Sequence, residues 1–139
     1  MEIKVQDKSN YLRSILILIG KDGKIGKAER QMVLKLSHIL GFSKSFCEEA
    51  VNDLLENEYI IDDPPLFSEK AIAEAFLKDG IRIAFADKGI HLYEMNWLKA
   101  VGDKNNISPE WQLNEFEKIQ KSTSAKAAEK LFEIAKLLR

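Results

Sequence analysis

Four carboxylates in this sequence recur at a spacing that could hold a metal ion. Asp22 and Glu29 are the first and last residues of the stretch Asp-Gly-Lys-Ile-Gly-Lys-Ala-Glu. Asp87 and Glu94 are the first and last residues of a similar stretch 65 residues further on. Carboxylate oxygens are the ligands that Ca²⁺ and Mg²⁺ prefer in proteins. If the fold brings the two stretches together, the four side chains could bind one divalent cation of this kind.

The same acidic residues also fit a purely structural role. Glu29 lies three residues after Gly26, at a position where a carboxylate accepts backbone N–H groups and stabilises a helix start by about 0.3–1 kcal/mol. The aspartates could close their own turns through side-chain hydrogen bonds. A standard EF-hand is excluded, because its first ligand positions would fall on Leu18 and Gly20, which have no side-chain oxygen. Metal binding and helix capping are both open interpretations.

The remaining reactive residues form no catalytic pattern. Cys47 falls on an apolar helical face, which predicts a buried side chain and not a nucleophile. His38 and His91 are far apart in the sequence, with no serine or cysteine pattern that would suggest a triad. The sequence therefore predicts a protein that is not an enzyme. Two alternatives are a metal-dependent enzyme that uses the same four carboxylates, and a purely structural adaptor.

Composition narrows the class of protein. The chain has 139 residues, of which 45% are hydrophobic and 31% are charged, as in globular proteins. Its 21 basic and 22 acidic residues give a net charge of -1, so nucleic-acid binding is not expected. The longest apolar run, Ile15–Ile19, is far shorter than the roughly 20 residues of a membrane-spanning helix. The N-terminus is too polar for a signal peptide, and a cytoplasmic location is expected.

Apolar residues at helical spacing predict an all-α fold of seven helices. Three prolines leave long stretches uninterrupted, while the glycines of Gly20–Gly26 and the pair Pro64–Pro65 predict connectors. Ser43 and Ser108 are typical of residues that cap helix N-termini. The expected helices are Ser9–Ile19, Lys27–Leu40, Ser43–Asn57, Ser68–Ala86, Leu92–Lys104, Ser108–Lys121 and Ser124–Leu138.

The chain also matches itself at an offset of 65 residues. The offset predicts two three-helix units, residues 9–57 and 68–121, related by a pseudo-two-fold axis. Each unit is too small to bury its apolar faces alone, so the units should pack together, with the final helix at 124–138 over the remaining core. A single domain spanning residues 1–139 is the result. Identical pairs are Leu12/Leu77, Asp22/Asp87, Ile25/Ile90, Glu29/Glu94 and Ser43/Ser108.

The paired motifs, Asp-Gly-x-Ile-x-x-x-Glu at Asp22–Glu29 and Asp-x-x-Ile-x-x-x-Glu at Asp87–Glu94, resemble the tellurite-resistance TerB-like family. The resemblance extends from Leu12 to Ser108, and one departure is the glycine of the second copy, which has moved one place to Gly89. The family includes the N-terminal region of a DnaJ-like membrane co-chaperone. The resemblance implies an all-helical duplicated fold, a role in stress response at the inner membrane face, and divalent metal on the repeated acids. We therefore expect an interaction module with a protein partner and peripheral membrane association.

Overall fold

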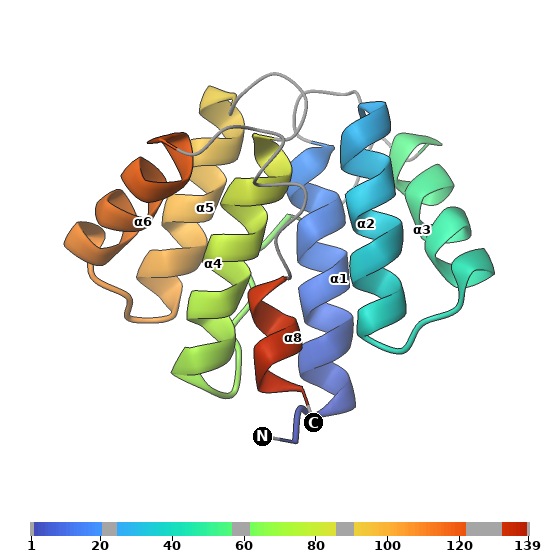
Figure 1. Ribbon diagram of the computed structural model, residues 1–139, viewed down its shortest axis with the longest axis horizontal. Helices are drawn as coiled ribbons and strands as arrows, with labels where there is room; N and C mark the ends of the chain where they lie inside the picture. Colours follow the sequence, from blue (N-terminus) through green and yellow to red (C-terminus); the bar gives the residue numbers. More distant parts are fainter. Residues whose placement is uncertain (1, 21–24, 57–61, 86–90, 122–131, 139) are drawn as a thin grey trace.

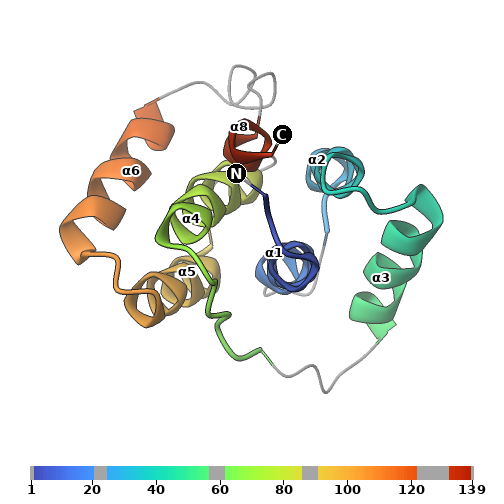
Figure 2. The ribbon, with the colours of Figure 1, turned by 90° about the horizontal axis from the view of Figure 1, so that it is seen from below.

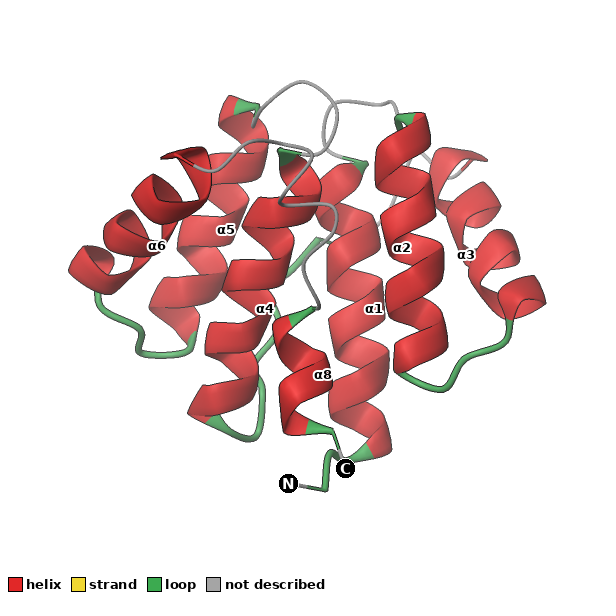
Figure 3. Ribbon diagram, in the orientation of Figure 1, coloured by secondary structure: helices red, strands yellow, loops and turns green. Residues whose placement is uncertain are grey.

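The computed structural model describes residues 2–20, 25–56, 62–85, 91–121 and 132–138. Within these ranges every regular element is a helix, which confirms the all-α fold (Figure 3). The helices are α1 (Val5–Ile19), α2 (Lys27–Ile39), α3 (Lys44–Glu56), α4 (Lys70–Ala84), α5 (Leu92–Lys104), α6 (Pro109–Lys121) and α8 (Glu133–Leu137).

Helices α1 and α4 lie side by side at the centre of the molecule, with α2 and α3 on one flank and α5 and α6 on the other (Figures 1 and 2). Because neighbours cover α1 on several sides, its apolar residues are not confined to a single stripe, and Ile15–Ile19 are all buried. Tyr11 on α1 and Phe76 on α4 are fully buried, with their rings edge to face at a centroid distance of 5.3 Å. The core therefore runs through the contact of the two central helices.

The helices of the two units correspond one to one. Each of α4, α5 and α6 begins and ends 65 residues after its counterpart α1, α2 or α3. Contacts between helices are matched as well, α1–α2 by α4–α5, α1–α3 by α4–α6, and α1–α5 by α4–α2. The duplication itself stays a prediction, which these matched bounds and contacts support.

The helix caps repeat at the same offset. The Ser43 hydroxyl accepts the N–H of Phe46 at 3.1 Å, and the Ser108 hydroxyl accepts the N–H of Trp111 at 3.1 Å, which confirms both predicted N-caps. After α2 and α5 the chain turns through a residue with positive φ, Gly41 at 93° and Asn106 at 59°. These are the residue types that adopt this conformation most readily at a helix end.

The end of the chain differs from its prediction. A single helix from Ser124 to Leu138 is wrong at Phe132, whose backbone is extended, and α8 begins only at Glu133. Residues 122–131 lie outside the described ranges. The physical reason for the late start is Asp79 on α4, because its carboxylate accepts the N–H groups of Glu133 and Ile134 and so caps α8 from outside.

Smaller differences concern the helix bounds and the connector. Helix α1 begins at Val5, four residues before the predicted Ser9, and α4 is shorter than predicted at both ends. Residues 62–67 are not helical, as Pro64–Pro65 predicts. In the described ranges no helix is both long and apolar enough to cross a bilayer.

Candidate functional site

Glu29 and Glu94 of the predicted metal set are both helix caps. Each is buried, and each accepts the backbone N–H three residues earlier, from Gly26 at 3.0 Å and from His91 at 2.8 Å. The capping interpretation is therefore confirmed for these two glutamates. Asp22 and Asp87 lie outside the described residues, so the structure does not show whether the four carboxylates meet.

The described ranges contain no other candidate for a metal centre. Within them, no three His, Cys, Asp or Glu side chains lie close enough together to hold an ion. The structure therefore leaves the predicted divalent cation untested, because half of its ligands are in the segments that are not described.

Cys47 is fully buried, as the sequence predicts. Its sulfur lies 4.0 Å from the carbonyl oxygen of Val33, and burial raises the pKa of the thiol. A raised pKa leaves less of the reactive thiolate at neutral pH. Cys47 is thus a small core residue of α3, packed toward α2.

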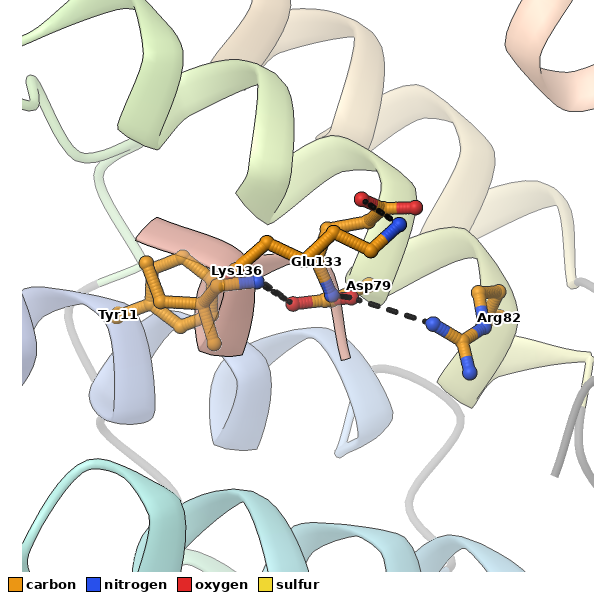
Figure 4. A network of polar contacts seen from close by, with 6 residues as sticks. Tyr11, Asp79, Arg82, Glu133 and Lys136 are labelled. Atoms are coloured by element: carbon orange, nitrogen blue, oxygen red, sulfur yellow. Dashed lines mark hydrogen bonds and ion pairs between the residues drawn. The ribbon is translucent and has the colours of Figure 1, made fainter. Parts of the chain in front are cut away.

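The most strongly perturbed carboxylate is one that the sequence did not single out, Asp79 in the middle of α4. Its Oδ2 accepts the Tyr11 hydroxyl at 2.6 Å and the N–H of Ile134 at 3.2 Å. Its Oδ1 accepts the N–H of Glu133 at 2.7 Å and lies 3.6 Å from Nη1 of Arg82. Figure 4 shows these side chains meeting from α1, α4 and α8.

Burial dominates the chemistry of this cluster. Loss of solvent raises the pKa of Asp79 to about 6, although the hydrogen bonds from Tyr11 and α8 and the nearby Arg82 oppose that rise. The pKa of Tyr11 is also raised well above its usual value, by burial and then by the Asp79 charge. Asp79 and Tyr11 are both fully buried, so the pair has no access to a substrate. The cluster is an anchor that fixes α8 on α4.

Arg82 completes the anchor. Its guanidinium lies over the ring of the buried Phe132 at 5.5 Å, directly before α8 begins. One sequence signal could have indicated the cluster, an Asp and an Arg one helical turn apart in a stretch that also holds the apolar Ile81 and Ile83. The matching residues of α1 are Ser14 and Ile17, so the offset of 65 itself marks Asp79 and Arg82 as departures.

A second feature is a hollow where residues 62–67, the connector that precedes α4, pass α5. It has a volume of about 520 Å³ and lies between Asp62–Pro64 and the α5 residues Tyr93, Asn96, Trp97 and Ala100. Tyr93 is 59% exposed, and both Asp62 and Asp63 are exposed. The hollow therefore combines aromatic surface with negative charge.

Hydrogen bonds fasten the connector along α5 and so give the hollow its shape. The indole N–H of Trp97 donates to the carbonyl of Asp62 at 2.7 Å, and Lys104 donates to the carbonyl of Pro64 at 2.7 Å. The buried Asn105 donates to the carbonyl of Pro65 at 2.8 Å and accepts the N–H of Phe67 at 2.9 Å. Four contacts over six residues make this surface preformed.

Family models, curated proteins and solved structures offer no match to this chain. The TerB-like resemblance accordingly stays a prediction, and a functional proposal has to rest on the geometry of the molecule.

Proposed function

We propose that this chain is a non-enzymatic helical interaction module that binds a protein partner in the hollow between the connector and α5. The observation that carries the proposal is the preformed combination of the exposed Tyr93 with the exposed Asp62 and Asp63, held in place by the buried Trp97. Aromatic residues are enriched where proteins bind each other, because they supply large contact area at low entropic cost.

The charge of the hollow specifies the partner. Among the described residues its lining contains two carboxylates and no basic residue, so a Lys or Arg side chain is the complementary group. A cation next to Tyr93 would also gain from the negative face of the ring. The partner is therefore a protein that presents a basic segment, and its affinity should fall as salt is added.

Two further observations support a binding role over a catalytic one. The perturbed pair Asp79 and Tyr11 is enclosed in the core, where it anchors α8. Leu92 and Tyr93 at the start of α5 are exposed. The residues that match them in the first unit, 65 positions earlier, are Lys27 and Ala28. At these positions the second unit thus exposes an apolar and an aromatic side chain, of the kind found at interaction sites, where the first unit has a lysine and an alanine.

Photo-crosslinking in cells tests the proposal. A photoreactive phenylalanine analogue replaces Tyr93, and the control places the same analogue at Lys27, which is exposed at the start of α2. We expect a defined crosslinked protein from position 93 alone, and a weaker crosslink in the background of Asp62→Asn with Asp63→Asn. Equal crosslinking from both positions, or no effect of the two substitutions, would contradict the proposal.

The resemblance to the TerB-like family suggests the process in which such a module would act, which is a stress response. Cells that lack the gene should then grow less well on tellurite, and the double variant Asp62→Asn, Asp63→Asn should fail to restore growth. Full restoration of growth on tellurite by that variant would show that the stress role does not depend on binding in the hollow.

A further inference from the structure

A groove between α4, α5 and α6 has the size and lining of a small-ligand site. Its volume is about 290 Å³. Leu77 and Ile81 of α4 line it together with Leu98 of α5 and Phe116 of α6. Sites for small molecules are concave and mostly apolar, with a few polar groups that fix the orientation of the ligand.

Two exposed lining residues of the groove are apolar where the matching positions of the first unit are charged. Met95 and Leu113 line it and are 39% and 58% exposed. At the matching positions the first unit has Arg30 and Glu48, and Glu48 pairs with Lys44 at 3.8 Å. Because Met95 and Leu113 border the same groove, their exposed surface extends its apolar lining, which suits an apolar ligand.

Gln112, one of the lining residues, is held by a close contact of α5 and α6. Gly102 leaves room for the side chain of Gln112, since a Cβ at Gly102 would come within 2.3 Å of Gln112 Nε2. That nitrogen donates to the carbonyl of Ile107 at 3.0 Å, which fixes the side chain. The matching residues of the first unit are Ser37 and Cys47, so the pair of Gly102 and Gln112 is particular to the second unit.

Lys99 supplies the charge of the groove. It is the one charged residue among the described residues of the lining, and its ammonium lies 2.9 Å from Asp103 Oδ2 in an exposed ion pair. Such surface pairs are weak, and an ammonium has three N–H donors, so Lys99 can donate to a ligand carboxylate as well. The complementary ligand therefore has an apolar body and one acidic group.

The volume limits the length of that body. A cavity of about 150 Å³ holds a benzene ring, so 290 Å³ holds a single chain of about ten carbons. A lipid with two acyl chains is too large for this space.

We propose that the groove binds a medium-chain fatty acid, with its alkyl chain among Leu77, Ile81 and Phe116 and its carboxylate at Lys99. The inference goes beyond the proposed partner binding, because the groove and the hollow share Asn96 and otherwise have different linings. Either site can thus fail its test without the other.

Calorimetric titration of the full chain with decanoate, below the concentration at which it forms micelles, tests the proposal. We expect saturable binding of one molecule per chain. The double variant Met95→Arg, Leu113→Glu introduces the residue types that the first unit has at these two positions. It should lower the affinity for decanoate at least about tenfold, because it places charge against the alkyl chain. The matched control, Arg30→Met with Glu48→Leu, should leave the affinity unchanged within about twofold.

The role of Lys99 is tested with a ligand that lacks the carboxylate. Lys99→Gln should lower the affinity for decanoate about fivefold and leave that for 1-decanol unchanged, whereas Asp103→Asn should raise the affinity for decanoate because it removes a competing anion. Equal effects of Lys99→Gln on both ligands would overturn the assignment of the carboxylate.

Three results would overturn the whole proposal. One is the absence of saturable binding, and another is decanoate binding that survives Met95→Arg with Leu113→Glu. The third is a concentration-dependent dimer in sedimentation experiments that this double variant abolishes, because a second copy of the chain would then be what covers the groove. Unchanged helical circular dichroism verifies that each variant is folded.

Discussion

At one matched position of the two central helices, α1 buries Ser14 and α4 buries Asp79. The Ser14 hydroxyl has no hydrogen-bond partner among the described residues, whereas the Asp79 carboxylate accepts three hydrogen bonds and lies beside Arg82. The difference has a clear structural effect, because only Asp79 receives the start of an additional helix, α8. At this matched position the second unit therefore has an attachment point for α8, and the first unit has a serine with no partner among the described residues.

The comparison extends from the core to the surface. Both units keep the same helix bounds, the same serine N-caps and the same capping glutamates. They differ where Met95 and Leu113 replace Arg30 and Glu48. The features that determine the backbone are thus shared, whereas the two proposed binding surfaces both include residues of α5 in the second unit.

The largest expected effect concerns the difference between the buried residues Asp79 and Ser14. Asp79→Ala should lower the free energy of unfolding at pH 7 by about 3 kcal/mol, because it leaves the Tyr11 hydroxyl and two N–H groups of α8 buried without their acceptor. Ser14→Ala should change it by less than about 1 kcal/mol, since no hydrogen bond in the described part of the structure is lost. Urea denaturation measures both values. Equal losses of stability in the two variants would mean that the hydrogen bonds of Asp79 contribute nothing beyond the packing of its side chain.

A smaller effect concerns the pH dependence of the same anchor. The folded pKa of Asp79 is raised to about 6, so the folded state holds this proton more tightly than the unfolded state, whose carboxyl has the ordinary pKa of 3.8. The stability contributed by the group therefore falls as pH rises between these values and is constant above them.

Asp79→Asn removes that titration and is the reference for it. Relative to this variant, the natural chain should lose about 1 kcal/mol of stability between pH 5 and pH 7, as judged from denaturation midpoints at the two pH values. A natural chain that instead gains stability over this interval would show that Arg82 and the hydrogen bonds outweigh burial.

The smallest expected effect concerns the acidic stretches that the two units share. Because Glu29 and Glu94 each cap a helix, we expect 10 mM CaCl₂ or MgCl₂ to change the melting temperature by less than about 1 °C, the size expected when no ion binds the folded state preferentially. A larger increase that Asp22→Asn with Asp87→Asn abolishes would establish the predicted divalent site. Sodium chloride at the same ionic strength is the control.

Local features of the fold were predictable because they depend on residues close together in the sequence. Ser43 and Ser108 each bond a backbone N–H three residues away, and Gly41 turns the chain directly after α2. The 65-residue offset predicted which helices would correspond. The predicted site was less complete, since Glu29 and Glu94 are placed as caps while Asp22 and Asp87 lie outside the described ranges.

The amino-acid sequence by itself thus determined an all-α chain, its helix starts and its two corresponding units, because helical spacing and caps act over three to five residues. Only the tertiary structure decided where α8 begins, since Asp79 meets Glu133 across 54 positions of sequence. It likewise decided that the connector lies along α5 and that Met95 and Leu113 share one groove. Such contacts depend on how distant segments pack, and no local pattern carries that information.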